Sequence, residues 1–275
     1  MVSEQQIAAQ VVAALQEDLG AGDLTAALLP AGVTATARVI ARQSAVLCGV
    51  AWFNAVFQQL DPLIVCDWHL QDGEQVSPDE PICELRGPAR TMLTGERTAL
   101  NLLQTLSGTA TTAAQYVQAV AGTGVQIRDT RKTVPGLRLA QKYAVLCGGA
   151  SNQRIGLYDA ILIKENHIQA AGSIQATLAA AHAVAADVSI QIEVESLEEL
   201  SSALSAGAES ILLDNFALEK LRQAVQMNQG RAYLEASGGI QATTVRAVAE
   251  TGVDAISVGD ITKNVQSVDY SMRLG

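Results

Sequence analysis

Six short apolar runs in the C-terminal two thirds of the sequence each end in a cluster of charged, hydroxyl or glycine residues. In chain order, these clusters are Asp129-Thr130-Arg131-Lys132, Lys164-Glu165-Asn166-His167, Glu193 with Glu195, Asp214-Asn215, Ser237-Gly238-Gly239 and Gly259-Asp260. In an α/β barrel, the carboxyl ends of the parallel strands converge on one mouth, where the reacting groups are found. Six such strand ends in succession therefore predict one polar site.

Arg131, Lys132 and Lys164 are the cations best placed to bind an anion at this mouth. A guanidinium offers a bidentate fork to carboxylate or phosphate, and an ammonium offers a compact charge. Residues 97–164 contain eight of the eighteen lysines and arginines and only two acids, which favours an anionic ligand. The alternatives are a solvated basic turn at Arg131 and Lys132, and a Lys164 side chain that extends to the rim.

Residues 165–219 have the opposite charge, with nine acids and no lysine or arginine. Glu193 alternates with apolar neighbours and therefore points to the inner side of a strand, where an unpaired carboxylate is costly. Asp214 occupies the equivalent place on the next strand. The two carboxylates could hold Mg²⁺ or stabilise a cationic transition state. The alternative is that they form salt bridges to Lys132 or Lys164.

Two glycine-containing loops lie in the last part of the chain. Ser237-Gly238-Gly239 precedes a predicted helix, and Gly259 precedes a short turn that ends in Lys263. Backbone N–H groups before a helix can bind an anion, and the last two strands of a barrel are a frequent phosphate site. We therefore expect these loops to bind a phosphate group.

The spacing of the β-branched runs predicts how these clusters are positioned. Runs start at residues 189, 210, 232 and 254, with helical patterns between them, and earlier runs lie at 125–127 and 160–163. Strand and helix alternating at this short period indicate βαβ units with a parallel sheet. Six units are fewer than a closed barrel needs. The fold class is therefore predicted to be α/β, with an incomplete (β/α) barrel over residues 111–275.

Residues 1–110 show a different pattern, which predicts an N-terminal α+β domain. An amphipathic helix is expected over residues 3–17, and a long helical stretch over about 91–121 would link the domain to the barrel. Apolar runs separated by turn residues predict a small, mostly antiparallel sheet with strands at 34–41, 45–48, 63–70 and 82–85. We expect the C-terminal tail of the barrel domain to pack back on this domain.

Composition excludes several classes of protein. With 275 residues, 49% of them hydrophobic, the chain can bury a large core, and its net charge of −10 argues against nonspecific nucleic-acid binding. The longest apolar run, Ala45–Phe53, is far shorter than the roughly 20 residues that cross a bilayer, and no secretory signal pattern is present. A cytoplasmic enzyme without membrane or nucleic-acid partners is expected.

The cysteines are Cys48, Cys66, Cys83 and Cys147. They are widely spaced, so we interpret them as buried apolar residues, not zinc ligands or disulfides.

Longer motifs connect these clusters to a known family. They are Gly95-Glu96-Arg97-Thr98-Ala99-Leu100-Asn101, Asp129-Thr130-Arg131-Lys132-Thr133, Pro135-Gly136-Leu137-Arg138, Lys142-Tyr143-Ala144-Val145, Leu162-Ile163-Lys164-Glu165-Asn166-His167 and Leu213-Asp214-Asn215-Phe216. In this order they resemble quinolinate phosphoribosyltransferase, the decarboxylating nicotinate-nucleotide pyrophosphorylase. The similarity extends from Glu17 to Gly259, essentially the whole chain.

The resemblance implies a pentosyltransferase of NAD biosynthesis. It also implies that the N-terminal α+β domain is sandwich-like and is joined to the incomplete α/β barrel. The reaction would convert quinolinate and phosphoribosyl pyrophosphate to nicotinate mononucleotide, pyrophosphate and CO₂, with Mg²⁺ as cofactor. The resemblance also implies a homodimer, or a higher oligomer built from it, whose active site takes residues from both subunits.

The resemblance further implies roles for the cations. Arg97 would reach in from the neighbouring subunit and, with Arg131 and Arg154, bind the two quinolinate carboxylates. Lys132 and Lys164 would neutralise the pyrophosphate and substrate anions, and both are expected to be catalytic.

Glu193 and Asp214 are the other catalytic residues that the resemblance implies. They would face the ribose and hold Mg²⁺, directly or through water and pyrophosphate. The 5′-phosphate would be held by Ser237, Gly238, Gly259 and Lys263.

Gln153 departs from the family pattern, which usually has histidine at this position. Glutamine can donate a hydrogen bond to a substrate carboxylate but carries no charge. Three other functions stay open from the sequence. They are a phosphoribosyltransferase for another aromatic acid, an aldolase-like barrel with Lys164 as a Schiff-base nucleophile, and a non-catalytic module that binds sugar phosphates.

Overall fold

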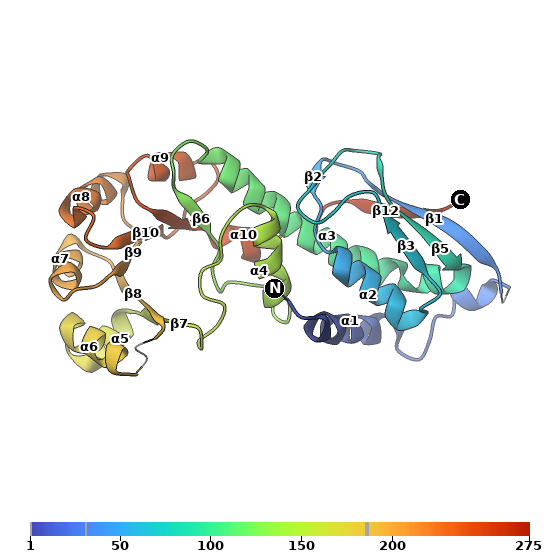
Figure 1. Cartoon of the computed structure of the whole chain (residues 1–275), viewed down its shortest axis with the longest axis horizontal. Coiled ribbons are helices and arrows are strands. Elements are labelled where there is room, and N and C mark those ends of the chain that lie inside the picture. Colours follow the sequence, from blue (N-terminus) through green and yellow to red (C-terminus); the bar gives the residue numbers. More distant parts are fainter. Residues whose placement is uncertain (1, 31, 185–186) are drawn as a thin grey trace. The chain divides into compact units, whose positions relative to one another are not determined.

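The computed structural model describes residues 2–30, 32–184 and 187–275 and divides the chain into two compact units (Figure 1). The first unit comprises Met1–Ala114, Thr133–Gly149 and Thr262–Gly275, and the second comprises Gln115–Lys132 and Ala150–Ile261. The two units therefore exchange segments across the expected boundary at residue 110.

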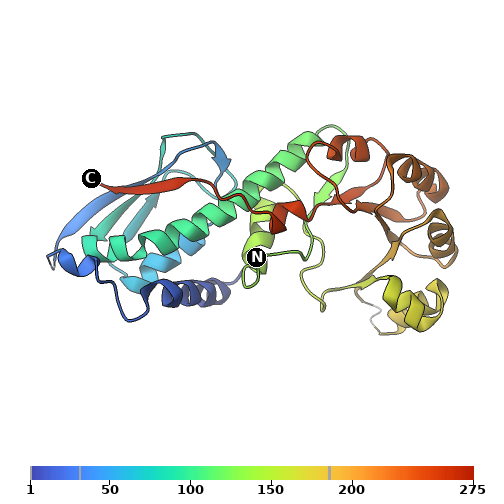
Figure 2. The same ribbon diagram turned by 180° about the vertical axis from the view of Figure 1, so that it is seen from behind.

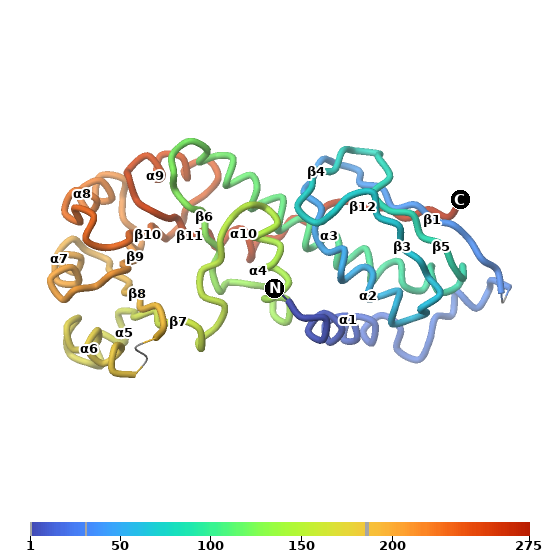
Figure 3. Tube along the Cα trace, viewed as in Figure 1, coloured from blue at the N-terminus to red at the C-terminus, as the bar shows by residue number. Residues whose placement is uncertain are grey.

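The first unit contains a four-stranded antiparallel sheet with the strand order β12-β1-β5-β3, and a separate pair, β2 and β4 (Figure 3). The strands are β1 Thr34–Ala41, β2 Ala45–Val46, β3 Val65–Trp68, β4 Gln75–Val76, β5 Pro81–Pro88 and β12 Tyr270–Leu274. The mostly antiparallel sheet agrees with the prediction from the apolar runs. β12 pairs with β1, so the C-terminal tail forms one edge of this sheet.

Helices pack with this sheet around one apolar core. They are α1 Glu4–Leu19, the 3-10 turn Ala26–Leu28, α2 Val50–Leu60, the first part of α3 Ala89–Ala119, and α4 Arg138–Cys147. Ser3 and Gln6 form the predicted capping box of α1. α2 was not predicted, although Trp52, Phe53 and Phe57 lie on its buried face at helical spacing.

α4 belongs to the first unit because its inner face completes that core. Ala140 and Ala144 are fully buried, and the Gln141 amide donates a 2.8 Å hydrogen bond to the Thr262 carbonyl oxygen. A proline near the first position of a helix is common, so the segment Thr133-Val134-Pro135-Gly136 predicts a helix start. This prediction is wrong. Pro135 and Gly136 form a turn, with Gly136 at φ +80°, and the helix begins at Arg138.

The second unit is an open barrel of six parallel strands, which confirms the predicted α/β class. The order β6-β11-β10-β9-β8-β7 leaves β6 and β7 as edges within the described residues, so the barrel is incomplete. The strands are β6 Gln126–Arg128, β7 Ala160–Ile163, β8 Ser189–Val194, β9 Ser210–Asp214, β10 Tyr233–Ser237 and β11 Ala255–Ser257.

Figure 1 shows the helices α6, α7 and α8 on the outer side of these strands. The helices of this part of the chain are α5 Glu165–Ala171, α6 Ile174–Val184, α7 Leu197–Ser205, α8 Leu218–Asn228, α9 Val245–Ala249 and α10 Asp260–Lys263. The helix predicted after Ser237-Gly238-Gly239 is α9, which begins at Val245 after an intervening turn.

The long helix α3 contributes buried side chains to the core of the first unit and also contacts the C-terminal tail. Figure 2 shows the tail passing beside this helix. Gly108 on α3 lies against the backbone of Gln266, and a Cβ there would collide with the Gln266 carbonyl oxygen. Within the residues that the structure describes, no helix has the length and apolarity needed to cross a membrane.

The close approach at Gly108 predicts the effect of a Gly108→Ala substitution. In an open helix, alanine is more stable than glycine by about 0.5–1 kcal/mol. Here we expect the opposite sign, with a free energy of unfolding lower by about 1–3 kcal/mol, because the backbone of the tail must shift. Urea unfolding measures this change. Thr105→Ala on the same helix is the control, and a Gly108→Ala protein more stable than the parent would contradict the contact.

Candidate active site

A cavity of about 400 Å³ opens at the carboxyl ends of the strands of the second unit. Its lining residues are Thr130, Arg131, Lys132, Gln153, Arg154, Leu162, Lys164, Glu193, Leu212, Asp214, Ser237 and Ser257. The structure therefore brings the predicted cations and the predicted carboxylates into one space. This volume lies in the usual range for small-molecule sites.

Asp129 ties together the two loops that supply the cations. The loop after β6 carries Arg131 and Lys132, and a second loop carries Gln153 and Arg154. The Asp129 side chain is fully buried and accepts hydrogen bonds from the Gln153 backbone N–H (2.8 Å) and the Asn152 side-chain amide (2.9 Å). A carboxylate with such partners is held in place. Asp129 therefore fixes both loops at the edge of the sheet.

Arg131 and Arg154 place two guanidinium groups close together. Burial lowers the pKa of Arg154, and the neighbouring positive charge of Arg131 lowers it further. The Nε atom of Arg131 is buried and has no hydrogen-bond partner among the described residues. Like charges held this close repel each other, so an anionic ligand with two or more acceptor oxygens would be favoured here.

Lys164 and Glu193 form a salt bridge across the same cavity, with 2.7 Å between Nζ and Oε2. The Glu193 side chain is only 9% exposed, and the Lys164 side chain is 43% exposed. A salt bridge to Lys132 or Lys164 is the alternative that the sequence left open for Glu193 and Asp214, and Glu193 forms the one to Lys164. His167 is exposed, and its Nδ1 accepts a 2.9 Å hydrogen bond from the Lys164 backbone N–H.

Asp214 ends β9 and is positioned by its neighbour Asn215, which the sequence analysis did not select. The Asn215 side-chain amide donates to Asp214 Oδ2 (2.8 Å), and the Asn215 backbone N–H donates to the Ser237 carbonyl oxygen (2.9 Å). Asn215 adopts a left-handed backbone with φ +57°. Gly238 has φ +103°, and a Cβ there would collide with Asn215. Gly238 is therefore required for packing, whatever it binds.

A buried polar network lies beneath the cavity. Gln153 Nε2 donates to Gln191 Oε1 (3.1 Å), and Gln191 Nε2 donates to Glu235 Oε2 (3.0 Å). Glu235 is completely buried and also accepts hydrogen bonds from Arg128 NH1 (3.0 Å) and the Ser257 hydroxyl. Buried polar groups connected in this way hold one another in a single arrangement. The orientation of Gln153 thus depends on a carboxylate two hydrogen bonds away.

Four predicted residues do not line the cavity. They are Arg97, Gly238, Gly259 and Lys263. Arg97 is exposed on α3, and Lys263 is exposed at the end of α10. A Cβ at Gly259 would lie 3.2 Å from Cδ of Lys132, so this glycine leaves room for the lysine side chain.

The cavity also has lining residues that the sequence analysis did not select as site residues: Thr130, Leu162, Leu212 and Ser257. A pattern in the sequence could have found two of them. Leu162 precedes Lys164 by two positions and Leu212 precedes Asp214 by two positions, so each pair shares one side of its strand. Leu162 and Leu212 were not predicted as site residues because they carry no charge.

The buried network predicts the effect of two substitutions at Glu235. Glu235→Ala leaves Arg128 and Gln191 without their partner, so we expect the free energy of unfolding to fall by about 3–5 kcal/mol. Glu235→Gln keeps an acceptor and should cost less. Glu250→Ala is the control, because Glu250 pairs with Arg246 on the surface and is worth less than about 1 kcal/mol. Equal losses for Glu235→Ala and Glu250→Ala in denaturant unfolding would contradict the network.

The fold and the cavity together define an open α/β barrel with a mouth built for anions. Comparison with known families agrees with this class. The quinolinate phosphoribosyl transferase N-terminal domain matches residues 23–107, and the C-terminal domain of the same family matches residues 109–273. The chain therefore belongs to the quinolinate phosphoribosyltransferase family, as its motifs indicated.

Relatives of known sequence or structure cover nearly the whole chain. The probable nicotinate-nucleotide pyrophosphorylase (carboxylating) of Bacillus subtilis is 41% identical over 257 residues, which are 93% of this chain and 89% of that protein. The human nicotinate-nucleotide pyrophosphorylase (carboxylating) is 38% identical over 98% of this chain and 91% of its own length. The solved structure of the nicotinate-nucleotide pyrophosphorylase from Francisella tularensis matches this chain with a TM-score of 0.98 and 43% identity. The match covers 100% of this chain and 98% of that one.

Proposed function

We propose that this protein is a quinolinate phosphoribosyltransferase that forms nicotinate mononucleotide, pyrophosphate and CO₂ from quinolinate and phosphoribosyl pyrophosphate. The observation that carries the proposal is one cavity in which Arg131, Lys132, Arg154 and Lys164 face Glu193 and Asp214. Relatives named nicotinate-nucleotide pyrophosphorylase support it along the whole chain. The product belongs to NAD biosynthesis.

The cations of the cavity suit both substrates, because each substrate is a polyanion. Arg131 and Arg154 lie close enough to influence each other electrostatically, and quinolinate carries two neighbouring carboxylates that could bridge them. Lys132 is exposed and Lys164 half-exposed, so both can reach a pyrophosphate group. The amide of Gln153, held by Gln191, would donate to a substrate carboxylate.

The carboxylates suit the chemical step. When pyrophosphate leaves, positive charge develops on the ribose ring, as in other oxocarbenium-like reactions. Glu193 and Asp214, placed on neighbouring strands, would stabilise that charge more in the transition state than in the substrate. Loss of CO₂ then leaves an electron pair beside a cationic ring nitrogen, a step that needs no separate catalytic acid.

The donor set of the cavity also fits Mg²⁺, which prefers carboxylate oxygens and water. Asp214 and Glu193 would hold it, the latter while paired with Lys164. When bound, the ion would neutralise the leaving pyrophosphate. The 5′-phosphate of the ribose would bind near Ser237, which lines the cavity, and near the loops of Gly238, Gly259 and Lys263.

The test is an assay of the purified protein with quinolinate, phosphoribosyl pyrophosphate and Mg²⁺, with nicotinate mononucleotide measured chromatographically. We expect the mononucleotide and CO₂ in equal amounts. No product from quinolinate, together with turnover of nicotinate or another ring acid, would overturn the substrate assignment. Binding of phosphoribosyl pyrophosphate without any turnover would instead support the non-catalytic alternative.

Gln153→His tests the neutral amide at the position where the family usually has histidine. An imidazole there would gain a proton as the pH falls through about 6.5, so quinolinate should bind more tightly at acidic pH. The parent protein, with no titrating group at this position, should be active with a weaker acid-side pH dependence of kcat/KM. A variant that binds quinolinate more than about 100-fold more tightly, or about 2.7 kcal/mol, would show that the charge is essential.

A homodimer with a shared active site is the assembly that we propose. Arg97 is exposed and lies outside the cavity lining of its own chain, which supports a role in the site of a partner subunit. Arg97→Ala and Arg131→Ala should each be nearly inactive as pure proteins.

Mixed dimers of these two variants should regain activity. A mixed dimer would hold one intact site and one doubly defective site, so random pairing should restore about a quarter of the parent activity. Co-expression followed by a turnover assay measures this rescue. Arg131→Ala mixed with Arg154→Ala is the control and should show none, because both residues line the same chain's cavity. No rescue in the first mixture would contradict the shared site.

A further inference from the structure

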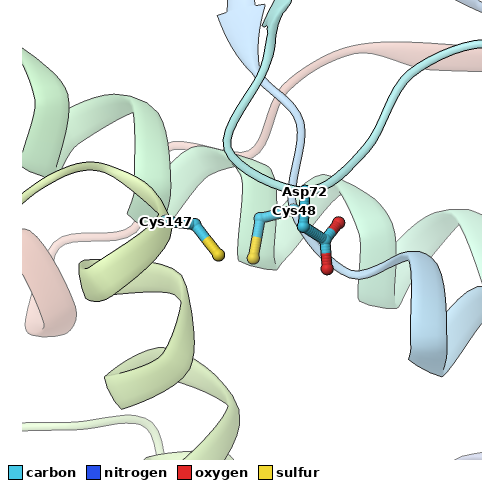
Figure 4. Close-up of side chains that lie close together, drawn as sticks. All are labelled: Cys48, Asp72 and Cys147. Atoms are coloured by element: carbon cyan, nitrogen blue, oxygen red, sulfur yellow. The ribbon is translucent and has the colours of Figure 1, made fainter.

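The first unit contains a cluster of possible metal ligands that takes no part in the proposed reaction. One ligand atom each of Cys48, Asp72 and Cys147 lies within 4.8 Å of the other two. Figure 4 shows these three side chains close together. Cys48 precedes α2, Asp72 lies between β3 and β4, and Cys147 ends α4. The interpretation of the cysteines as separate apolar residues therefore missed this cluster, because the fold joins distant segments.

Asp72 is held in place but keeps capacity for one more contact. Its Oδ1 accepts hydrogen bonds from the backbone N–H groups of Gly49 (2.9 Å) and Val50 (3.1 Å), at the start of α2. Its Oδ2 accepts a 2.9 Å hydrogen bond from the Tyr143 hydroxyl. A carboxylate oxygen has two lone-pair sites, so these bonds fill Oδ1 and leave one site on Oδ2. A cation at Oδ2 would have the Tyr143 hydroxyl as an outer partner.

The two thiols differ in how readily they lose a proton. Cys48 is fully buried, and burial, the hydrogen bond to Cys147 and the charge of Asp72 all raise its pKa. The hydrogen bond from Cys48 and a contact with Tyr143 lower the pKa of Cys147. Two thiolates beside a carboxylate would repel one another strongly in this partly buried cluster. A divalent cation would compensate most of that charge.

We propose that Cys48, Asp72 and Cys147 bind one zinc ion, with water as the fourth ligand. Binding releases the two thiol protons to solvent and forms two Zn–S bonds and one Zn–O bond, with no change in oxidation state. Tetrahedral zinc, with bonds of about 2.3 Å to sulfur and about 2.1 Å to oxygen, needs ligand atoms roughly 3.5–3.8 Å apart. The ligand atoms lie within 4.8 Å of one another, so each pair would have to approach by no more than about 1.3 Å to reach this geometry.

The donor atoms of this cluster distinguish it from the Mg²⁺ site that we propose in the barrel. Thiolates select zinc over magnesium, whereas the barrel offers only carboxylates to a metal. Zinc would tie the end of α4 to the start of α2 within the first unit. Because it binds the folded protein, it should also raise the melting temperature.

The test is a titration of the metal-free full-length chain with Cd²⁺, which gives a thiolate-to-metal absorption in the ultraviolet. We expect the absorption to reach its limit at one ion per chain, and zinc to displace it. Zinc should protect two of the four cysteines from alkylation. Binding should weaken as the pH falls, since protons compete for the thiolates. Binding of Cd²⁺ by the carboxylates of the barrel would not give this absorption.

Three substitutions assign the site, and one serves as control. Cys147→Ser, Cys48→Ser and Asp72→Asn should each weaken zinc binding by more than about tenfold. Asparagine at position 72 can still accept the hydrogen bonds from Gly49 and Val50, so this variant tests the charge even if the buried Cys48→Ser protein fails to fold. Cys66→Ser is the control, because Cys66 lies beside Cys83 in a second thiol pair.

Three results would overturn the proposal. The first is an absorption that survives Cys147→Ser but is lost in Cys66→Ser. The second is zinc binding unchanged by Asp72→Asn. The third is a disulfide between Cys48 and Cys147 that forms in air at the same rate with and without zinc, which would make the pair a redox site.

Discussion

Positive charges that repel one another are held together at the mouth of the barrel, and the rest of the site depends on this arrangement. Burial disfavours the charge of Arg154, and the neighbouring positive charge of Arg131 adds to the cost. The carboxylates of Asp159 and Glu193 offset part of that penalty. A bound anion would offset more of it, so the arrangement favours a substrate with several negative charges. Lys132 extends the positive surface toward solvent.

The scaffold must resist this repulsion, and it does so with buried carboxylates. Asp129 anchors the two cationic loops, and Glu235 holds Arg128 and Gln191 from inside the barrel. Both carboxylates are completely buried, so each is stabilised only by its hydrogen-bond partners. Neither touches the cavity, yet together they set where Gln153 and the arginines can lie. The barrel therefore separates the groups that face a substrate from the groups that position them.

In the first unit, too, a carboxylate holds segments of the chain in place. The partly buried carboxylate of Asp72 accepts hydrogen bonds from the N–H groups of Gly49 and Val50 at the start of α2 and from the Tyr143 hydroxyl, so one side chain fixes a helix start against α4. Two thiols complete the same cluster. The cluster and the mouth of the barrel thus use opposite chemistry, soft donors in one and hard charges in the other.

The sequence by itself determined the class of fold and most of the charged residues of the cavity. Strand spacing near 22 residues, and polar residues after each apolar run, are local properties that a parallel barrel converts directly into a common mouth. The motifs were sufficient to indicate the family. Arg131, Lys164, Glu193 and Asp214 could therefore be named before any coordinates.

Only the tertiary structure decided the contacts between segments distant in the sequence. Examples are the salt bridge between Lys164 and Glu193, and the hydrogen bonds that link Gln153 to Glu235 through Gln191. Others are the placement of α4 in the first unit and the proximity of Cys48 to Cys147. In each case, the separation of the segments along the chain carries no information about their distance in space. Periodicity reports which face of an element is buried, but the packing of elements chooses the partners on that face.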